Sequence, residues 1–100
     1  MHITLFQKKV YEIVKKIPRG RVTTYAAVVR AIRNPHAARA VGNALNKNRF
    51  RDVPCHRVIR SDGYVGGYAW GEKKKIEILR REGLRITNCN VESLQILKDL

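Results

Sequence analysis

The pattern of apolar and polar residues predicts that the chain opens with an amphipathic helix. Apolar residues recur at helical spacing, with lysines and glutamate between them, at Phe6, Val10, Ile13, Val14 and Ile17. Thr4 and Gln7 have the spacing of a capping box at the start of this helix. Pro18 and Gly20 are residue types that end helices. We therefore expect this helix to cover a core with its apolar face and to expose a basic one.

A second helix is predicted from Thr24 to Arg33. Thr23 or Thr24 is its expected cap. Its expected buried positions are Val28, Val29 and Ile32. Asn34-Pro35 then forces a turn, because a proline disfavours the α conformation in the residue before it.

The third predicted helix runs from about His36 to Asn46. Its apolar face comprises Ala38, Val41 and Leu45. Its opposite face carries Arg39, Asn43 and Asn46. Two short helices joined by a tight turn, the second exposing arginine and asparagine, are typical of a helix-turn-helix, here at about residues 24–46. Many helical hairpins bind nothing, so this pattern does not establish a function by itself.

The second half of the chain is predicted to be less regular. Val58-Ile59 is expected to form a short strand that ends at the turn residues 61–63. Residues 64–71 are rich in glycine and aromatic side chains and predict an irregular loop. A further helix is expected from Glu72 to Glu82, with Gly83 at its C-terminal cap position.

The tail from Asn88 to Leu100 is predicted to form a short helix whose apolar positions are Val91, Leu94 and Leu97. A chain of 100 residues without repeats or a linker suits one compact domain, residues 1–100. The expected fold class is mainly α with a small β element. No apolar stretch reaches the length of about 18 residues that suggests a membrane span, and residues 5–17 are too charged for a signal peptide. We therefore expect a cytoplasmic protein with no membrane partner.

The charge balance indicates an anionic partner. The chain contains 21 lysine and arginine residues against 8 aspartate and glutamate residues, which gives a formal net charge of +13. In a chain this small, such an excess favours nucleic acid, the commonest anionic partner. The alternative is that the charge serves general solubility.

Two cysteines, Cys55 and Cys89, are too few for a disulfide framework or a four-cysteine zinc site. In a cytoplasmic protein both are expected to be free thiols. Cys89 lies between two asparagines, away from any histidine or basic cluster, and we interpret it as incidental. No metal site is expected.

Cys55 has the surroundings of a reactive thiol. It lies between Pro54 and His56, and the same segment holds Arg51, Arg57 and Arg60. Positive charge and a nearby imidazole favour the thiolate, which is the nucleophilic form. His56 would take the proton, directly or through a water, and Glu82 is a candidate to orient the imidazole. The alternative is a buried structural cysteine.

The segment from Pro54 to Ile59, Pro-Cys-His-Arg-Val-Ile, resembles the active-site signature of the O6-alkylguanine-DNA alkyltransferases, also called methylated-DNA–protein-cysteine methyltransferases. Further resemblances occur in the same order along the chain, at Gly20 to Tyr25, Ala37 to Gly42, Asn48, Gly66 to Tyr68 and Arg81 to Gly83. Together they cover about residues 6–86. The resemblance implies the catalytic and DNA-binding domain of this family, with a winged-helix-like helix-turn-helix fold; most members carry a further N-terminal domain.

The resemblance implies a role for each matching residue of the reaction centre. Cys55 would accept the alkyl group from guanine O6 in one in-line displacement, and each molecule would react once without a cofactor. His56 would act as a base through a water, oriented by Glu82. Tyr25 would help to rotate the nucleotide out of the duplex and donate a proton to the leaving guanine. Asn48 would brace the segment that leads to Cys55.

The resemblance also implies the contacts with DNA and with the alkyl group. A monomer would bind the minor groove of double-stranded DNA that contains O6-alkylguanine, and the protein would be nucleoid-associated. Arg39 would replace the flipped base in the stack. The other expected DNA-binding residues are Thr24, Tyr25, Ala38, Gly42 and Asn43. The expected pocket residues are Val58, Gly66, Tyr68, Ala69 and Trp70.

Particular residues depart from the family pattern near the pocket. Phe50 and Arg51 stand where many relatives place a proline, and Ala69 and Trp70 replace a frequent serine and a small residue. These differences bear on which alkyl groups the pocket accepts.

Two other functions compete with alkyl transfer. Alkyltransferase-like proteins share this domain and bind alkylguanine without repairing it, but they carry another residue, often tryptophan, in place of the cysteine. The presence of Cys55 favours transfer. A helix-turn-helix regulator would leave the Cys-His-Arg segment unexplained.

Overall fold

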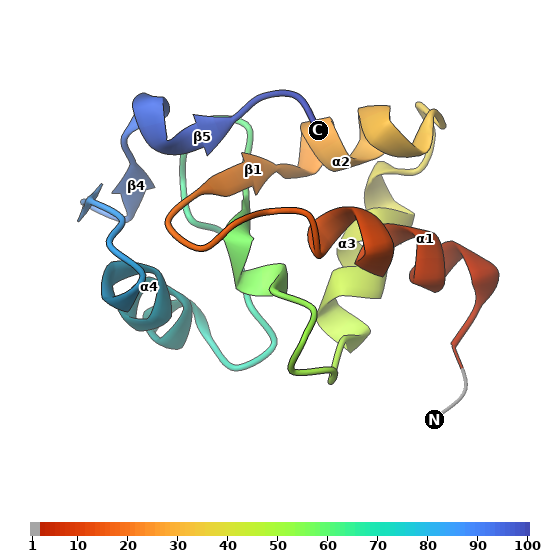
Figure 1. Cartoon of the computed structure of the whole chain (residues 1–100), viewed down its shortest axis with the longest axis horizontal. Helices are drawn as coiled ribbons and strands as arrows, with labels where there is room; N and C mark the ends of the chain where they lie inside the picture. Colours follow the sequence, from red (N-terminus) through yellow and green to blue (C-terminus); the bar gives the residue numbers. More distant parts are fainter. Residues whose placement is uncertain (1–2) are drawn as a thin grey trace.

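A computed structural model describes residues 3–100. Three helices, α1 (Leu5–Val14), α2 (Tyr25–Ile32) and α3 (Ala38–Lys47), pack against one another on one side of the molecule (Figure 1). The predicted capping box of α1 is confirmed, because the Thr4 side chain accepts from the Gln7 N–H and the Gln7 side chain accepts from the Thr4 N–H. Ile17 lies beyond the helix end but is still buried.

A short parallel sheet occupies the middle of the molecule. Its strands β1 (Val22–Thr24), β2 (Val58–Ile59) and β5 (Ile96–Leu97) are ordered β2-β1-β5, and both outer strands run parallel to β1. Thr23 pairs with Val58 on one side and with Leu97 on the other. Because β1 ends where α2 begins, the sheet fixes the start of the helix-turn-helix.

The helix-turn-helix forms as predicted. Thr24 caps α2 through its hydroxyl, which accepts from the Ala27 N–H at 3.1 Å, and Val28 is fully buried. Arg33 ends α2 in the left-handed conformation, with φ of 63°. The predicted inward position of Ala38 is wrong: Ala38 is exposed and Ala37 is buried, because the inward face of α3 continues from Val41 to Ala37, four residues earlier.

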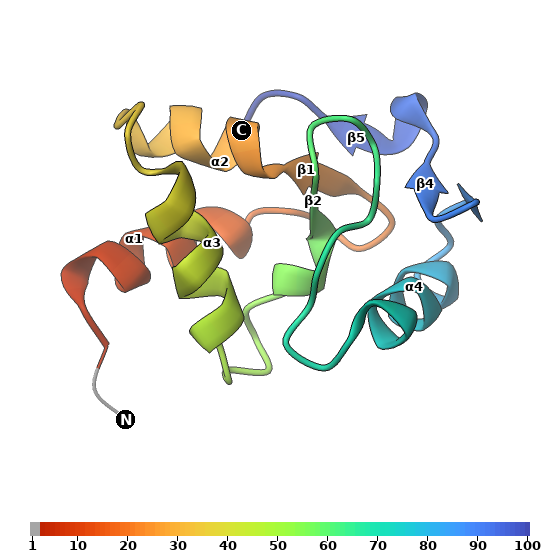
Figure 2. The same ribbon diagram turned by 180° about the vertical axis from the view of Figure 1, so that it is seen from behind.

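The segment from Pro54 to Gly83 also agrees with the sequence prediction. A single turn of 3-10 helix, η1 (Cys55–Arg57), leads directly into β2. An irregular loop then crosses in front of β2 (Figure 2) and leads to α4 (Glu72–Arg81). Gly83 follows α4 with φ of +97°, a conformation that favours glycine at a helix end.

The predicted helix in the tail is wrong. The tail contains a hairpin of β3 (Ile86–Thr87) and β4 (Asn90–Val91), a 3-10 turn η2 (Ser93–Gln95), and β5. Asn88 and Cys89 both have positive φ, as a tight hairpin turn requires, and a helix cannot contain them. Leu94, an expected buried position, is 92% exposed.

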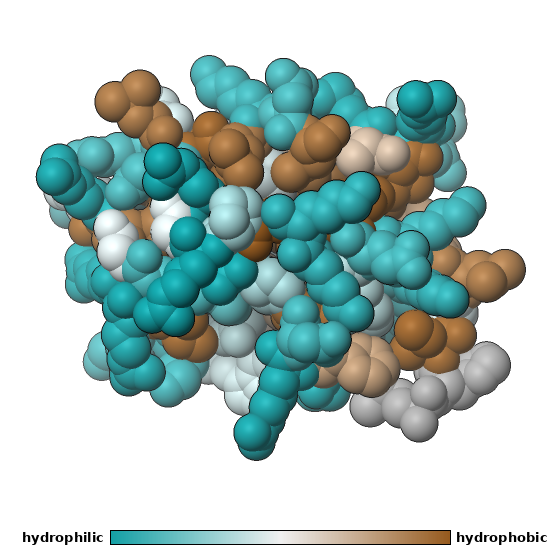
Figure 3. Space-filling model, viewed as in Figure 1, coloured by the Kyte–Doolittle hydropathy of each residue, from teal (hydrophilic) through white to brown (hydrophobic). Residues whose placement is uncertain are grey.

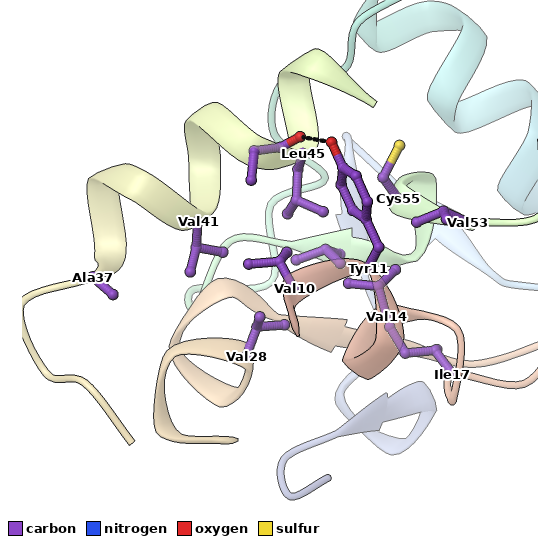
Figure 4. Close-up of a cluster of buried hydrophobic side chains, with 12 residues drawn as sticks. Val10, Tyr11, Val14, Ile17, Val28, Ala37, Val41, Leu45, Val53 and Cys55 are labelled. Atoms are coloured by element: carbon purple, nitrogen blue, oxygen red, sulfur yellow. Dashed lines mark hydrogen bonds between the residues drawn. The ribbon is translucent and has the colours of Figure 1, made fainter. Parts of the chain in front are cut away.

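Two apolar clusters meet at the sheet. The first lies among α1, α2 and α3 and includes Val10, Val41 and Cys55, which sits at the edge of the cluster (Figure 4). The second lies between the sheet, α4 and the β3–β4 hairpin and includes Ile59 and Leu79. The segment that carries Cys55 therefore lies where the helix-turn-helix half meets the half that contains α4. Within residues 3–100 no helix has the length and apolar character needed to cross a membrane.

Candidate active site

Cys55 is held at a fixed position by the residue that ends α3. The Cys55 side chain is buried, with 6% of the residue exposed. Asn48, also buried, donates through Nδ2 to the Val53 carbonyl at 3.0 Å and to the Cys55 Sγ at 3.3 Å, and its Oδ1 accepts from the Phe50 N–H. Asn48 thus joins the end of α3 to Cys55 and to the segment that precedes it. The structure therefore places a hydrogen-bond donor directly against the Cys55 sulfur.

His56 and Glu82 form the predicted pair, and Arg57 completes it. The His56 Nε2 lies 3.1 Å from Glu82 Oε2. Arg57 binds the same carboxylate twice, with Nη2 at 2.7 Å and Nε at 3.0 Å, and its Nη1 donates to the Ile17 carbonyl at 2.8 Å. Because an ionised carboxylate can only accept, the His56 Nε2 carries a proton and Nδ1 is the basic atom. Arg57 was not predicted as a partner of Glu82.

The electrostatics of this network keep His56 neutral and Glu82 ionised. Burial lowers the pKa of His56 below its usual 6.5. The hydrogen bond to Glu82 and the charge of Glu82 raise this pKa, but less than burial lowers it, and the charges of Arg57 and Lys75 lower it further. Burial by itself would raise the pKa of Glu82, but the bonds and charges of Arg57 and His56 outweigh burial and bring it below 4.5. His56 is therefore available as a base near neutral pH, which is what a paired thiol requires.

A cavity of about 410 Å³ opens beside Cys55. Its lining includes the predicted residues Asn48, His56, Tyr68 and Trp70. The Tyr68 and Trp70 rings form one wall, with centroids 5.3 Å apart. The structure thus brings Cys55, His56 and the two aromatic side chains together in one cavity.

The remaining predicted pocket residues surround this hollow without lining it. Val58 is fully buried in β2, and Ala69 is exposed next to Trp70. Gly66 is buried with φ of +75°, and a Cβ there would lie 3.2 Å from the Arg60 side chain, so this turn of the loop requires glycine.

Among the described residues, Tyr25 is not part of the lining of the cavity beside Cys55. It lines a second hollow of about 740 Å³, together with Ala38 and the α2–α3 turn. Burial, and then the charge of Cys55, raise the pKa of Tyr25 above 10, so its hydroxyl keeps its proton. The structure does not place Tyr25 and Cys55 in one cavity; each lines a separate hollow.

The predicted DNA-facing residues of α3 lie on one exposed surface. Ala38, Arg39 and Asn43 are exposed, and Gly42 is half-buried. In the part of the chain that the structure describes, no side chain caps the start of α3 at Ala37, so the first N–H groups of the helix lack a side-chain acceptor there. On the face that Figure 3 shows, hydrophilic side chains cover much of the surface, with smaller apolar areas between them. Among residues 3–100, no cluster of histidine, cysteine or acidic side chains has the arrangement of a metal site.

Lys75 is a site residue that sequence reasoning missed. It is fully buried, and its Nζ donates to the Val58 carbonyl at 2.7 Å and to the Gly67 carbonyl at 3.0 Å, which ties β2 to the pocket loop. Nζ also lies 6.0 Å from the Tyr25 ring centroid. Burial lowers the pKa of Lys75 from 10.5 to about 8. The spacing of Lys75 from Leu79, four residues along α4, was the available signal, since both belong to the buried face.

Replacing Lys75 with methionine is expected to change how stability depends on alkaline pH. The pKa of Lys75 is lowered on folding, so between about pH 8 and 10.5 the unfolded chain binds more protons than the folded one. Wild type should therefore gain stability relative to Lys75→Met as pH rises through this range, by roughly 3 kcal/mol in total. Urea unfolding at several pH values measures this difference. The exposed neighbour Lys73→Met serves as control; a flat or falling difference for Lys75→Met would contradict the expected shift.

The fold and the site define a helix-turn-helix domain with a buried, braced cysteine beside a His-Glu-Arg network. The chain belongs to the family described as 6-O-methylguanine DNA methyltransferase, DNA binding domain, whose model matches residues 5–84. It is 47% identical over 81 residues to a methylated-DNA–protein-cysteine methyltransferase of Methanosarcina acetivorans, covering 80% of this chain and 52% of that protein. It is 42% identical over 80 residues to the bifunctional transcriptional activator/DNA repair enzyme Ada of Escherichia coli, covering 79% of this chain and 23% of Ada.

Comparison with solved structures points to the same family. Mycobacterium tuberculosis OGT in complex with DNA matches 81% of this chain and 50% of that chain, with a TM-score of 0.76 and 39% identity. S. pombe Atl1, solved with damaged DNA containing O6-carboxymethylguanine, matches 91% of this chain and 89% of its own, with a TM-score of 0.74 and 34% identity. The chain spans about half or less of the length of the curated relatives it matches.

Proposed function

We propose that this chain repairs DNA by transferring the alkyl group of O6-alkylguanine to Cys55, once per molecule. The observation that carries the proposal is the Cys55 sulfur, which accepts from Asn48 at 3.3 Å and lines the same cavity as His56. The family membership and the names of the curated relatives support the same reaction. The step forms a bond from Cys55 Sγ to the alkyl carbon and breaks the bond from that carbon to guanine O6.

The network around Cys55 supplies the proton transfers that this displacement needs. His56 Nδ1 accepts the thiol proton through a water, and Glu82 stabilises the imidazolium that results, with Arg57 holding the carboxylate in place. Tyr25, whose pKa is raised by burial, keeps a proton that it donates to the departing guanine. The Val58 carbonyl accepts from Lys75 and retains a second lone pair for the guanine amino group.

The exposed face of α3 is the proposed DNA contact, through the minor groove. The small side chains beside Arg39 allow the helix to approach a groove closely, and the uncapped start of α3 offers N–H groups to a phosphate. Arg39 enters the stack when the target nucleotide turns out of the duplex. The net charge of +13 favours binding that is insensitive to sequence and sensitive to salt. One copy of the chain suffices for this arrangement.

A measurement of the intact mass of the protein tests the proposal. The protein is mixed with a duplex that contains one O6-methylguanine, and its intact mass is measured before and after. We expect a gain of the mass of one CH₂ group per chain, and no second gain when fresh substrate is added. A duplex with unmodified guanine is the control. Tight binding to the damaged duplex without any mass gain would exclude the transfer reaction.

A damage sensor without transfer activity is the second candidate. It is favoured by the match to S. pombe Atl1, which covers 91% of this chain and 89% of Atl1. The mass experiment separates the two functions, because a sensor would bind the damaged duplex without any change in the mass of the protein. The geometry around Cys55 favours transfer, since Asn48 and His56 have no evident purpose beside a cysteine that does not react.

A further inference from the structure

The cavity beside Cys55 has a positively charged rim. Arg49, Arg51 and Lys74 contribute to its lining, and within residues 3–100 no carboxylate does. The proposed reaction leaves these three side chains without a role, because they are not part of the His56 network or of the exposed face of α3.

Arg49 is fixed at the rim by contacts that leave its charge unbalanced. Its Nη1 donates to the carbonyls of Asn46 at 2.8 Å and Asn48 at 2.9 Å, at the end of α3. Its guanidinium also lies over the Trp70 ring, 5.2 Å from the centroid. Trp70 is 54% exposed, so this pair stands at the mouth of the cavity. None of these partners is an anion.

The other two cations are also poorly neutralised. Lys74 lies 4.0 Å from Glu77, and Arg81 holds the same carboxylate oxygen more closely. Within residues 3–100, Arg51 makes no ion pair. Three cations facing one hollow repel one another, so an anion that enters the hollow is stabilised by all three.

We propose that Arg49, Arg51 and Lys74 recognise an anionic group on the O6 substituent, so that carboxyalkyl adducts of guanine are substrates of Cys55. This inference rests on the proposed function. A carboxylate next to the reacting carbon repels an approaching thiolate, and cations on the far side of the substituent offset that repulsion. The step forms the bond from Sγ to the methylene carbon, breaks its bond to O6, and passes the thiol proton to solvent through His56 while guanine gains one. The products are S-carboxymethylcysteine and guanine.

The experiment compares three duplexes that carry O6-methylguanine, O6-carboxymethylguanine or its neutral amide, O6-carbamoylmethylguanine. Single-turnover rate constants are measured for wild type, Arg51→Gln and Lys74→Gln. The carboxylate-to-amide rate ratio is expected to fall about fivefold in each variant, the effect of losing one partly exposed charge contact. The ratio should also fall as salt is added. Lys73→Gln, on the same helix but outside this cavity, should leave the ratio unchanged.

The outcomes separate the rim proposal from its alternatives. A ratio that stays within about twofold in both variants, below the effect of one such contact, overturns the proposal. An equal slowing on all three duplexes also overturns it, because the cations would then contact the DNA backbone. In either case, methyl transfer by the wild-type protein leaves the proposed function intact, whereas a lack of transfer by wild type from all three duplexes overturns both.

Discussion

Replacing Cys55 with alanine is expected to abolish the gain of mass on reaction with the damaged duplex. The affinity for DNA should stay within about twofold of wild type, because the cysteine lies outside the charged surface that supplies most nucleic-acid affinity. The fold should survive the change. Asn48 keeps its bonds to the Val53 carbonyl and the Phe50 N–H, so no buried amide group loses all its partners. Intact mass and a binding titration at fixed salt measure the two quantities.

Two further variants sharpen this prediction. Cys55→Ser keeps an acceptor for the Asn48 amide, but a hydroxyl ionises far less readily than a thiol, so we expect no transfer at neutral pH. Cys89→Ser changes the other cysteine, which lies in the β3–β4 turn, and should transfer at the wild-type rate. A mass gain in Cys55→Ala, or its loss in Cys89→Ser, would show that the acceptor has been assigned to the wrong residue.

The helical half of the fold could be predicted because its signals are local. The capping box of α1, the Thr24 cap and the turn at Asn34-Pro35 each depend on residues within one or two turns of helix. The parallel pairing of β1 with β2 and β5 depends on residues far apart in the sequence. Strands of two or three residues are too short to show an alternating pattern.

The tail shows why a spacing can mislead. Val91, Leu94 and Leu97 recur every three residues, as on a helix, but Val91 packs in the second apolar cluster while Leu94 is exposed. Leu97 instead pairs with β1, and its carbonyl accepts from the Thr23 hydroxyl at 2.6 Å. This competition between local pattern and distant strand pairing is decided only by the tertiary fold.

The site residues that belong to a recognisable sequence motif could be predicted, whereas those that are brought to the site only by tertiary packing were missed. Cys55, His56 and Glu82 were expected from the resemblance. In the structure Cys55 and His56 line the same cavity, and His56 is hydrogen-bonded to Glu82. Lys75 follows two lysines, so its residue type gave no sign of burial, and only its spacing from Leu79 placed it on the buried face of α4. Arg57 binds a carboxylate 25 residues away, a separation over which composition and spacing carry no information.

Replacing Glu82 with glutamine is expected to slow transfer by about a hundredfold or more, the usual contribution of a correctly charged general base. The amide keeps the size of the side chain but removes the charge that stabilises the His56 imidazolium. It also leaves Arg57 largely buried without its anion, which should cost about 3 kcal/mol of stability. Rates are therefore compared at temperatures where circular dichroism shows both proteins folded. Glu77→Gln, an exposed carboxylate on the same helix, is the control and should react at the wild-type rate.

The pH dependence separates loss of the base from loss of the fold. His56 has a lowered pKa, so the wild-type rate should hold below pH 6.5 and fall only in more acidic solution. Glu82 raises the pKa of His56, so in Glu82→Gln the midpoint of the pH–rate profile should move to still lower pH while the plateau rate drops.

The lowered pKa of Glu82 gives wild type a contribution to stability that is complete above pH 4.5 and is lost as pH falls through the folded-state value. The stability gap between wild type and variant should therefore close in acid. A plateau rate within about threefold of wild type, far less than loss of a general base causes, would show that the carboxylate serves only to hold Arg57.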